Sequence, residues 1–409
     1  MNTLFLGMSS RNTEQYRSTN TGADEFQWRL LNGLSVAASP ENLTSFRFAP
    51  MASFPKANAP LCVPTQSIDN NLINTDITFG YINLPIIKQL QRIGVFRKNI
   101  RNWLETHEGE KNIMVYSPYL PYLCALKPLR RKYNFKLIVI VPDAPGKFGI
   151  LNGNALKRAI VTMWGDLAIA QCRIADGFIL ITDMMKEPIR VGKRPYIVVE
   201  GAVDLLVAHI PQNTITVNAQ AKKVILYTGF LKEMFGVLDL VEAFEQINRD
   251  DYELWFAGGG PAAEAIEQKA RVNPHIKYFG ILPHDDVVNL QLQATVMVNP
   301  RRNNGIYTKY SFPSKTFDYL ASGKPVVMYR LDGIPKDYDE HLFYVNGNNI
   351  ADLKARIVEV CEMEPALREK IGKGNAEWVT RTKSYIVQGE RIYEFLCRED
   401  KYTQYNSNR

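Results

Sequence analysis

Apolar runs of strand length alternate with amphipathic stretches of helix length along almost the whole chain of 409 residues. Near-continuous Val, Ile and Leu strands separated by helices form parallel sheets that are covered on both faces, so the chain is predicted to be an α/β protein. Because such connections are right-handed, each series of strands builds a doubly wound, Rossmann-like unit. The first series is Thr3–Met8, Asn112–Tyr116, Lys136–Val141, Gly177–Thr182 and Tyr196–Val199, and the second is Val224–Thr228, Glu253–Ala257, Ile276–Phe279, Thr295–Asn299 and Pro325–Tyr329.

A chain of this length exceeds one ordinary core, so two domains are expected. The stretch 208–223 is polar, has no clear hydrophobic period and separates the two series, which makes it the predicted linker. The expected domains are then 1–207 and 224–380, with a helical segment over 381–409 that packs back on the first domain. Two α/β domains joined in this way bind ligands in the cleft that they face.

Composition restricts the class of protein further. Hydrophobic residues make up 46% and charged residues 22%, which is typical of a soluble globular chain. No run of eighteen apolar residues is present and the start lacks a basic segment, so neither a transmembrane helix nor a signal peptide is expected. Five scattered cysteines fit a reducing compartment and give no metal-ligand spacing. The expected location is the cytoplasm, with the inner face of the cell membrane as an option.

The excess of positive over negative charge lies in the first half of the chain. Residues 1–204 hold 24 Lys and Arg against 16 Asp and Glu, and the remainder holds 25 against 26. The stretch Lys88–Leu104 contributes five of these cations and no acid, with apolar residues interleaved. Two interpretations stay open: a basic amphipathic helix on an anionic membrane, or a helix packed on its sheet with a solvated basic face. Nucleic acid is not expected as a partner, because no known binding module is present.

The segment 309–327 reads as a loop, a short helix and a buried strand. Ser314 is expected to cap the helix after Pro313, and Gly323 to end it. Lys315 in the first turn opposes the helix dipole unless an anion sits there. Asp318, one turn later, is suited to bind hydroxyls. A phosphate beside the lysine and a diol beside the aspartate suggest a nucleotide, whereas the alternative is an ordinary crossover with a solvated lysine.

Further residues follow the strands of the second series. Gly229 follows the first strand and Gly258-Gly259-Gly260 the second, and glycines there let a ligand approach the backbone. Arg301 follows the fourth strand, where its guanidinium suits bidentate phosphate binding. Ligands bind at the carboxyl ends of strands in open α/β sheets, so these residues and Lys315 are predicted to meet at one edge. Structural turns and a solvated arginine are the alternatives.

The run Val224–Val327 resembles the donor-binding domain of GT-B glycosyltransferases, in particular retaining glycosyltransferase family 4 and its bacterial polysaccharide-cluster branch. Four pieces in the right order and spacing carry the resemblance: Tyr227–Gly236, Trp255–Pro261, Phe279–Pro283 and Phe317–Val327. It covers about a quarter of the chain strongly, and the first half by architecture.

The resemblance implies a role for individual residues. Asp318 would bind the ribose hydroxyls, Ser314 and Lys315 the diphosphate, and the backbone of Gly280, Ile281 and Leu282 the base. Gly22 fits the glycine loop of the first, acceptor-binding domain, which faces the donor phosphates. From its place after the strand Lys136–Val141, Asp143 could orient an acceptor hydroxyl or accept its proton, or simply form a turn.

Three positions depart from the family pattern. Phe230 and Phe235 stand where an arginine and a lysine usually neutralise the diphosphate, and Tyr310 stands where the first motif glutamate is expected. Lys315, Arg301 and Lys309, with Lys232, are the candidate replacements. The expected catalytic residues are therefore Lys315, Asp143 and Tyr310.

Together these features predict a glycosyltransferase that moves a sugar from a nucleotide sugar to a hydroxyl of a lipid-linked or oligosaccharide acceptor in cell-surface polysaccharide synthesis. Retention of configuration follows from the resemblance alone. No metal or other cofactor is expected, because lysine, arginine and the helix dipole can offset the phosphate charge. Two alternatives remain: a non-catalytic GT-B subunit that binds an acceptor or a partner enzyme, and a nucleotide-sugar epimerase.

Overall fold

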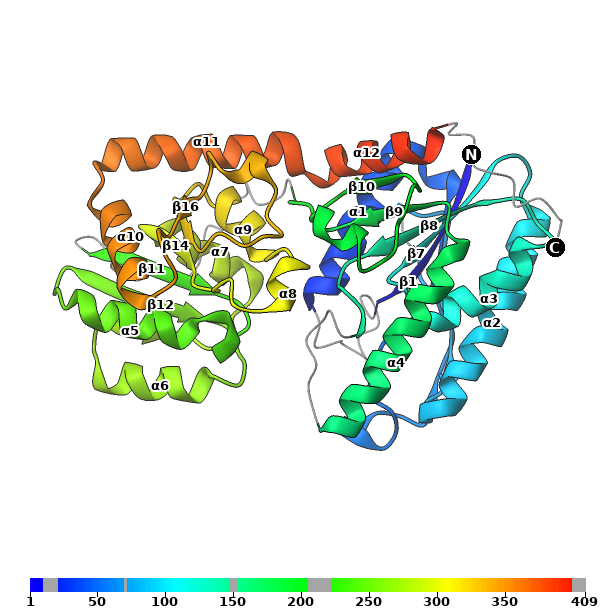
Figure 1. The fold of residues 1–409 in the computed structure, drawn as a ribbon, viewed down its shortest axis with the longest axis horizontal. Coiled ribbons are helices and arrows are strands. Elements are labelled where there is room, and N and C mark those ends of the chain that lie inside the picture. Colours follow the sequence, from blue (N-terminus) through cyan, green and yellow to red (C-terminus); the bar gives the residue numbers. More distant parts are fainter. Residues whose placement is uncertain (10–20, 70–71, 147–153, 205–221, 399–409) are drawn as a thin grey trace. The chain divides into compact units, whose positions relative to one another are not determined.

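The computed structural model describes residues 1–9, 21–69, 72–146, 154–204 and 222–398. They form two compact units, each with its own sheet (Figure 1). Unit 1 is Met1–Ala202 together with the C-terminal segment from Tyr385, and unit 2 is Val203–Ser384. The predicted linker 208–223 lies outside the described residues except for its last two positions. No helix in the described ranges has the length and hydropathy needed to cross a bilayer.

Unit 1 is built on an eight-stranded sheet in the order β10-β9-β8-β7-β1-β2-β5-β4. All its neighbouring strands are parallel except the short edge pair β4–β5. The order reverses at β1 and β7, which pair from Asn2↔Lys111 to Leu6↔Val115. The strands are β1 (Asn2–Met8), β2 (Leu43–Phe48), β4 (Gln66–Ser67), β5 (Thr75–Thr78), β7 (Lys111–Tyr116), β8 (Lys136–Val141), β9 (Gly177–Leu180) and β10 (Tyr196–Val198), with a separate ribbon of β3 (Cys62–Val63) and β6 (Tyr81–Ile82).

Helices cover this sheet on both faces. A core cluster joins the sheet to α1 and α12 through residues such as Leu31, Leu34 and Phe395, so these two helices share one face. The other helices, α2 to α4, pack against one another in sequence order, as Figure 1 also shows. The helices are α1 (Thr21–Ala38), α2 (Pro85–Thr106), α3 (Leu120–Arg130), α4 (Ala155–Gln171) and α12 (Tyr385–Cys397).

Two glycines let α1 and α12 approach unusually closely. A Cβ placed on Gly33 would lie 2.0 Å from the carbonyl oxygen of Tyr385, and one on Gly389 would lie 2.1 Å from the carbonyl carbon of Gly33. No side chain fits at either point, so the backbones themselves are in contact. This crossing fixes the C-terminal helix on unit 1, far along the chain from the residues it contacts.

We expect Gly33→Ala to destabilise the chain by about 1–3 kcal/mol, the usual range for overpacking a tight contact. A thermal unfolding midpoint measures it. Gly94 is the matched control, because it lies in α2 with no atom near its Cβ position. Gly94→Ala should stabilise by about 0.5–1 kcal/mol through helix propensity. Equal midpoints for Gly33→Ala and the unsubstituted chain would show that the helices do not cross this closely.

Unit 2 is built on a six-stranded, wholly parallel sheet in the order β13-β12-β11-β14-β15-β16. Numbered from its own first strand, this is the 3-2-1-4-5-6 order of a dinucleotide-binding fold, whose ligands bind where the order reverses. The reversal lies between β11 and β14. The strands are β11 (Lys223–Thr228), β12 (Tyr252–Ala257), β13 (Ile276–Tyr278), β14 (Val296–Asn299), β15 (Val326–Met328) and β16 (Phe343–Tyr344).

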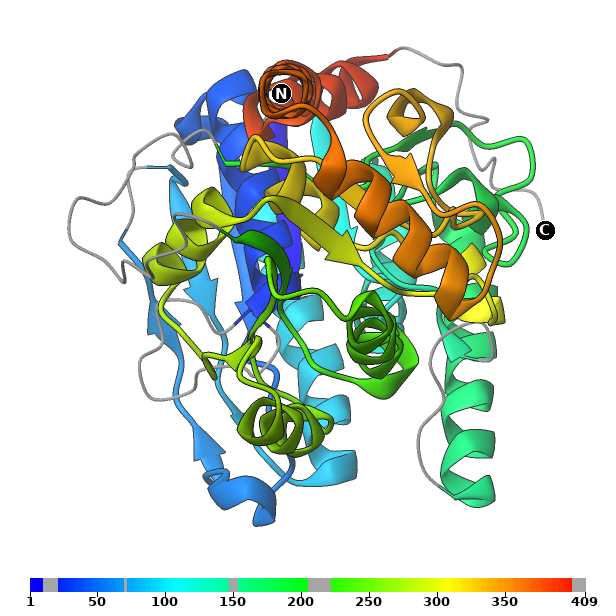
Figure 2. The ribbon, with the colours of Figure 1, turned by 90° about the vertical axis from the view of Figure 1, so that its left-hand side faces the viewer.

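Two core clusters show that helices also cover both faces of this sheet. One cluster joins the strands to α5, α6 and α10, and the other joins them to α7, α9 and α11. Figure 2 shows this second sheet, seen obliquely, with helices on either side of it. The helices are α5 (Val237–Ile247), α6 (Ala263–Val272), α7 (His284–Gln293), α8 (Ile306–Lys309), α9 (Lys315–Ala321), α10 (Ile350–Glu362) and α11 (Pro365–Lys383). The predicted α/β class, with a doubly wound parallel sheet in each half, is confirmed.

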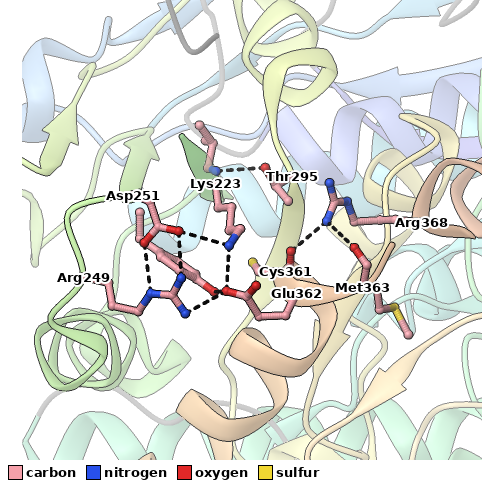
Figure 3. Close-up of polar contacts among 10 residues, drawn as sticks. Lys223, Arg249, Asp251, Thr295, Cys361, Glu362, Met363 and Arg368 are labelled. Carbon is pink, nitrogen blue, oxygen red and sulfur yellow. Dashed lines mark hydrogen bonds and ion pairs between the residues drawn. The ribbon is translucent and has the colours of Figure 1, made fainter. Parts of the chain in front are cut away.

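Charged groups at the amino edge of this sheet are closely paired (Figure 3). The Lys223 ammonium lies 3.0 Å from Asp251 and 2.7 Å from Glu362, and the Arg249 guanidinium lies 2.9 Å from each carboxylate. Tyr252 donates a hydrogen bond to Glu362 at 2.6 Å. Hydrogen bonds from Arg249 and Lys223 respectively lower the pKa of Asp251 and of Glu362. These four charged groups are therefore paired with one another.

Candidate functional site

The opposite, carboxyl edge of the unit 2 sheet holds the predicted site. At its centre β11 pairs with β14 through Ile225↔Val296 and Leu226↔Met297, so both strands end at the same level. Gly229 follows β11 and Arg301 follows β14 by two residues. The helix α9 begins at Lys315, whose side chain reaches the same point. The structure thus brings together three residues that the sequence predicted to meet.

Lys315 is the central group of this edge. Its ammonium lies 3.7 Å from the centre of the Tyr227 ring, and a Cβ on Gly229 would lie 3.0 Å from Nζ. Gly229 has φ +116°, so a side chain there would be strained and would also have to displace the Lys315 ammonium. Within the described part of the chain, Lys315 makes no hydrogen bond or ion pair; its recorded close partner is the aromatic ring.

The surroundings disfavour the charged form of this lysine. Desolvation lowers the pKa of Lys315 to about 7, the nearby Arg301 charge adds to the shift, and Asp318 opposes it. The residue as a whole is only partly buried, but its ammonium lies against the end of β11, beside Gly229 and the Tyr227 ring. An anion bound beside Lys315 and Arg301 would raise the pKa of Lys315 again, because a nearby opposite charge favours the protonated amine.

Arg301 is held rigidly beside it. Its guanidinium lies 4.7 Å from the Tyr307 ring and 5.5 Å from the Phe235 ring. Nη2 donates a hydrogen bond of 2.7 Å to Ser311 Oγ, which in turn donates to the Tyr307 carbonyl at 2.7 Å. Phe235, where the family pattern has a lysine, therefore supports an arginine instead. The aromatic pair positions the guanidinium without neutralising it.

The helix α9 is anchored to the end of β11 by a tyrosine that sequence reasoning missed. Thr228 N–H donates to Tyr319 Oη at 2.9 Å, and Tyr319 O–H donates to the Thr228 carbonyl at 3.0 Å. Lys315 and Tyr319 are four residues apart and share a helix face. That spacing is the signal that both side chains would point at the same strand end. Tyr227, whose ring contacts the Lys315 ammonium, was likewise not predicted as a site residue.

Glycines continue the backbone ladder past the strand ends. Gly258 N–H donates to the Gly280 carbonyl at 2.7 Å, and Leu231 N–H donates to the Gly259 carbonyl at 2.8 Å. A Cβ on Gly259 would lie 2.8 Å from the Ile281 side chain, which is itself exposed, while Leu282 packs partly buried against the core. The predicted base-binding residues Gly280, Ile281 and Leu282 therefore lie on this edge, and their contact with a base stays a prediction.

The remaining predicted donor residues lie around the start of α9. Ser314 is the N-cap residue of α9, as predicted, but it is exposed and its side chain makes no capping hydrogen bond. The Pro313 and Ser314 carbonyls instead accept the first helical hydrogen bonds, from Thr316 and Phe317. Asp318 is partly buried. Lys309 is exposed and lies 5.8 Å from the ring of Tyr310, just after α8. The roles of these residues stay predictions.

Unit 1 holds the other two predicted site residues, which are described by their own surroundings. Gly22 is exposed and lies in the first turn of α1. Asp143 is exposed and lies two residues beyond β8. Burial raises the pKa of Tyr116, at the end of β7, and the Asp143 and Asp24 carboxylates add to the rise. The carboxyl edge of this sheet therefore gathers two acids and a phenol, which suits hydroxyl binding.

The predicted basic face of Lys88–Leu104 requires a correction. Lys88 is buried, and its ammonium donates to the Met51 carbonyl and to Asn83 Oδ1, both at 3.1 Å. Arg92 is also buried, 3.6 Å from the Phe48 ring, and donates to the Tyr119 hydroxyl at 2.9 Å. Two of the five cations thus point into unit 1. The expectation of a continuous basic surface on this helix is wrong.

A separate pocket of about 780 Å³ lies in unit 2 between α11 and the residues around η9 (Lys336–Tyr338). Its lining includes His341 and Trp378, whose rings stack at 3.9 Å, and none of the predicted site residues. We place the site at the carboxyl edge of the sheet rather than in this pocket. Lys315, which makes no hydrogen bond or ion pair among the described residues, lies at that edge together with the glycines that follow the strands. No three His, Cys, Asp or Glu side chains in the described ranges are grouped as metal ligands.

Known proteins match both the sequence and the structure. Residues 222–363 match the family described as glycosyl transferases group 1. A GDP-mannose-dependent monoacylated alpha-(1-6)-phosphatidylinositol monomannoside mannosyltransferase of Corynebacterium glutamicum is 24% identical over 173 residues. That match covers 41% of this chain and 45% of the mannosyltransferase, so the chain spans less than half of this curated relative.

Solved structures match over almost the whole chain. Sucrose-phosphate synthase of Thermosynechococcus elongatus has a TM-score of 0.64 at 15% identity, covering 97% of this chain and 99% of that one. Anabaena HepE in complex with UDP has a TM-score of 0.63 at 13% identity, with the same coverage. The chain has the GT-B fold. The matches support a GT-B glycosyltransferase of group 1 and do not reach family 4 or its polysaccharide-cluster branch.

We expect replacement of the central lysine of this GT-B protein by Met to stabilise it below about pH 7. The pKa of Lys315 is lower in the folded state than its ordinary 10.5, so the unfolded chain binds the extra proton between these values and stability rises with pH there. The lysine therefore costs most stability below pH 7. The gain for Lys315→Met should be on the order of 1 kcal/mol after allowance for partial exposure.

Thermal midpoints at several pH values test this expectation. The difference between Lys315→Met and the unsubstituted protein should shrink as the pH rises from about 7 to about 10.5. A midpoint for Lys315→Met below that of the unsubstituted protein at low pH would show that the ammonium is already well solvated or paired.

Proposed function

We propose that this protein transfers a sugar from a nucleotide-sugar donor to a hydroxyl group of an acceptor. The observation that carries the proposal is the Lys315 ammonium beside Arg301, at the point where the strand order of unit 2 reverses; among the described residues it makes no hydrogen bond or ion pair. The two neighbouring cations repel each other, and a bound diphosphate would offset that repulsion. The group 1 match over 222–363 and the UDP bound by HepE support the same choice of ligand.

In the proposed reaction the bond from the anomeric carbon to the diphosphate oxygen breaks, and a bond from that carbon to the acceptor oxygen forms. The leaving diphosphate gains negative charge as this happens. Lys315 and Arg301 would stabilise it, which is the electrostatic contribution that lowers the barrier most directly. The acceptor proton passes to the leaving phosphate or to a carboxylate such as Asp143. Tyr310 would lie at the edge of the reacting sugar, Asp318 would bind the ribose and Gly280–Leu282 the base.

The acceptor is proposed to be lipid-linked or an oligosaccharide, in the assembly of a cell-surface polysaccharide. The similarity to a mannosyltransferase named for a phosphatidylinositol mannoside acceptor favours a lipid-linked one. Retention of configuration is proposed on the family resemblance. The proposal includes no metal: lysine and arginine would meet the phosphate charge.

The exposed Phe230 is the observation that favours a second candidate, a non-catalytic GT-B subunit. A phenyl ring with 55% of its surface exposed stands where the family pattern has a phosphate-binding arginine. Such a subunit would bind an acceptor or a partner enzyme and no nucleotide. The epimerase alternative differs in needing no acceptor, so product analysis with and without acceptor separates it.

A thermal-shift screen with nucleoside diphosphates and nucleotide sugars tests the proposal, since a ligand of the folded state raises the midpoint. For the ligand found, we expect Lys315→Met to weaken binding and to lower transfer at least about tenfold, because a charge-assisted contact is lost. Lys324→Met is the matched control: burial also lowers the pKa of Lys324, but this lysine precedes β15 at the opposite edge.

Nucleotide binding should also depend on pH. Since a phosphate favours the protonated Lys315, binding takes up a proton above about pH 7, and affinity falls as the pH rises. Titration calorimetry in buffers of different ionisation enthalpy measures this uptake, which Lys315→Met should abolish. Failure of every nucleoside diphosphate to bind the unsubstituted chain would instead favour the non-catalytic subunit.

A further inference from the structure

The start of α2 exposes apolar side chains where the sequence suggested cations. Ile86 is 75% exposed and Leu90 64%, with Ile87 exposed between them. The preceding segment adds Phe54 and Leu61, which are also exposed. These five side chains come from two segments that are hydrogen-bonded to each other, so they form one apolar surface rather than isolated exposed residues.

A buried polar centre holds the two segments together. The side-chain amide of Asn83 donates to the carbonyls of Ala52 and Pro60, and its backbone N–H donates to the Leu61 carbonyl. The Lys88 ammonium ties Met51 to the same asparagine. Phe54 and Leu61 are therefore held beside the start of α2 by a set of five hydrogen bonds around Asn83 and Lys88, so the arrangement of this apolar surface is fixed within unit 1.

The helix α4 exposes a second apolar surface. Leu156 is 70% exposed, and Ile160, Met163 and Leu167 continue along the same side at helical spacing, with Val161 and Trp164 beside them. The helix packs against unit 1 mainly through Gly165, Ala168 and Ile169 in its C-terminal half. Its first two turns thus project apolar side chains into solvent. A helix of a soluble domain normally turns such a stripe to its core.

Both surfaces lie at the same end of unit 1. In Figures 1 and 2, which are related by a turn about the vertical axis, the starts of α2 and α4 and the segment around η3 (Lys56–Asn58) all reach the lower end of this unit. We call the exposed apolar side chains there the apolar rim: Phe54, Leu61, Ile86, Ile87, Leu90, Leu156, Ile160 and Met163.

Positive charge predominates around the apolar rim. The stretches 51–68, 77–94 and 154–165 contain no Asp or Glu, and the exposed Asp166 lies one helical turn beyond Met163. The exposed cations close to the rim residues along the chain are Lys56, Lys157 and Arg158. Apolar side chains with interleaved cations and few acids are the composition of a surface that binds anionic lipid.

We propose that the apolar rim docks unit 1 on an anionic lipid bilayer. Several apolar side chains gathered at one end of the unit fit a lipid surface, and they would enter the boundary between headgroups and acyl chains to a depth of about 5–10 Å. Lys157 and Arg158 would contact headgroup phosphates. The proposal extends the proposed function, because both helices begin at the carboxyl edge of the unit 1 sheet, where a lipid-linked acceptor would arrive. It replaces the basic helix face predicted from sequence.

Vesicle co-sedimentation of the full chain tests this surface without any nucleotide sugar, so its result is independent of the proposed transfer. The full chain should bind phosphatidylcholine vesicles that contain phosphatidylglycerol, and bind them more weakly without it. Ile86→Gln with Leu90→Gln, and separately Leu156→Gln with Ile160→Gln, should each lower vesicle partitioning at least about tenfold, because two inserted apolar side chains are lost.

Matched controls separate insertion from general effects. Val272→Gln with Leu367→Gln changes two exposed apolar residues of unit 2 and should leave partitioning unchanged. Lys157→Gln with Arg158→Gln should weaken binding only to the anionic vesicles, by at least about tenfold.

Trp164 gives a direct probe of depth, since it is partly exposed on α4 whereas Trp28, Trp103 and Trp255 are buried. Lipids brominated on the acyl chain should quench its fluorescence, and Trp164→Phe should bind vesicles normally but lose the quenching. The proposal would be overturned if the unsubstituted chain did not bind vesicles, or if both double variants (Ile86→Gln with Leu90→Gln, and Leu156→Gln with Ile160→Gln) bound them normally. It would also be overturned if the protein were a dimer in solution that both double variants converted to a monomer, which would assign the apolar rim to self-association.

Discussion

The parallel pairing of β11 with β14 is the constraint on which the candidate site depends. Because Leu226 lies opposite Met297, both strands finish at one level, and the residues that follow them meet even though some seventy positions separate them along the chain. Gly229 then leaves the space that the Lys315 ammonium occupies. Tyr319 hydrogen bonds hold α9 on the same strand end. No single residue makes the site; the register of two strands and one helix does.

The two edges of this sheet treat charge in opposite ways. At the amino edge, Lys223 and Arg249 share the carboxylates of Asp251 and Glu362, at a solvent-exposed position where such pairs contribute little stability. At the carboxyl edge, Lys315 is desolvated and, among the described residues, its ammonium contacts the Tyr227 ring and makes no hydrogen bond or ion pair. Unpaired, desolvated charge reduces stability, so its presence is best explained by a ligand of opposite charge. The contrast within one sheet is what distinguishes a binding site from a stabilising network.

Sequence patterns predicted most of the architecture because buried parallel strands are continuous apolar runs. All ten predicted strands are present with ends shifted by no more than two residues. The strands β2, β3, β4, β5, β6 and β16 were not predicted. In β2 the sequence Leu43–Phe48 includes Arg47, which is fully buried and paired with Asp76 of the neighbouring strand. A charged residue in a strand indicates a solvent-exposed position unless a buried partner is known. Here the partner, Asp76, lies 29 positions along the chain from Arg47.

The rotation of α2 about its own axis follows from a competition between its side chains for burial. Its buried stripe contains Phe96, Ile100, Trp103 and Leu104, and the helical period extends this stripe backwards onto Arg92 and Lys88. Rotating the helix to bury Ile86 and Leu90 would expose Phe96 and Trp103. Aromatic side chains bury about 150–250 Å² each, more than the aliphatic ones gained, so the aromatic half sets the rotation. The two cations are then forced inward, where Asn83, Tyr119 and the Phe48 ring receive them, and the aliphatic residues are forced outward. The exposed apolar residues at the start of α2 are therefore a direct consequence of how α2 packs. The exposed cations Lys56, Lys157 and Arg158 near the apolar rim favour an anionic partner for it.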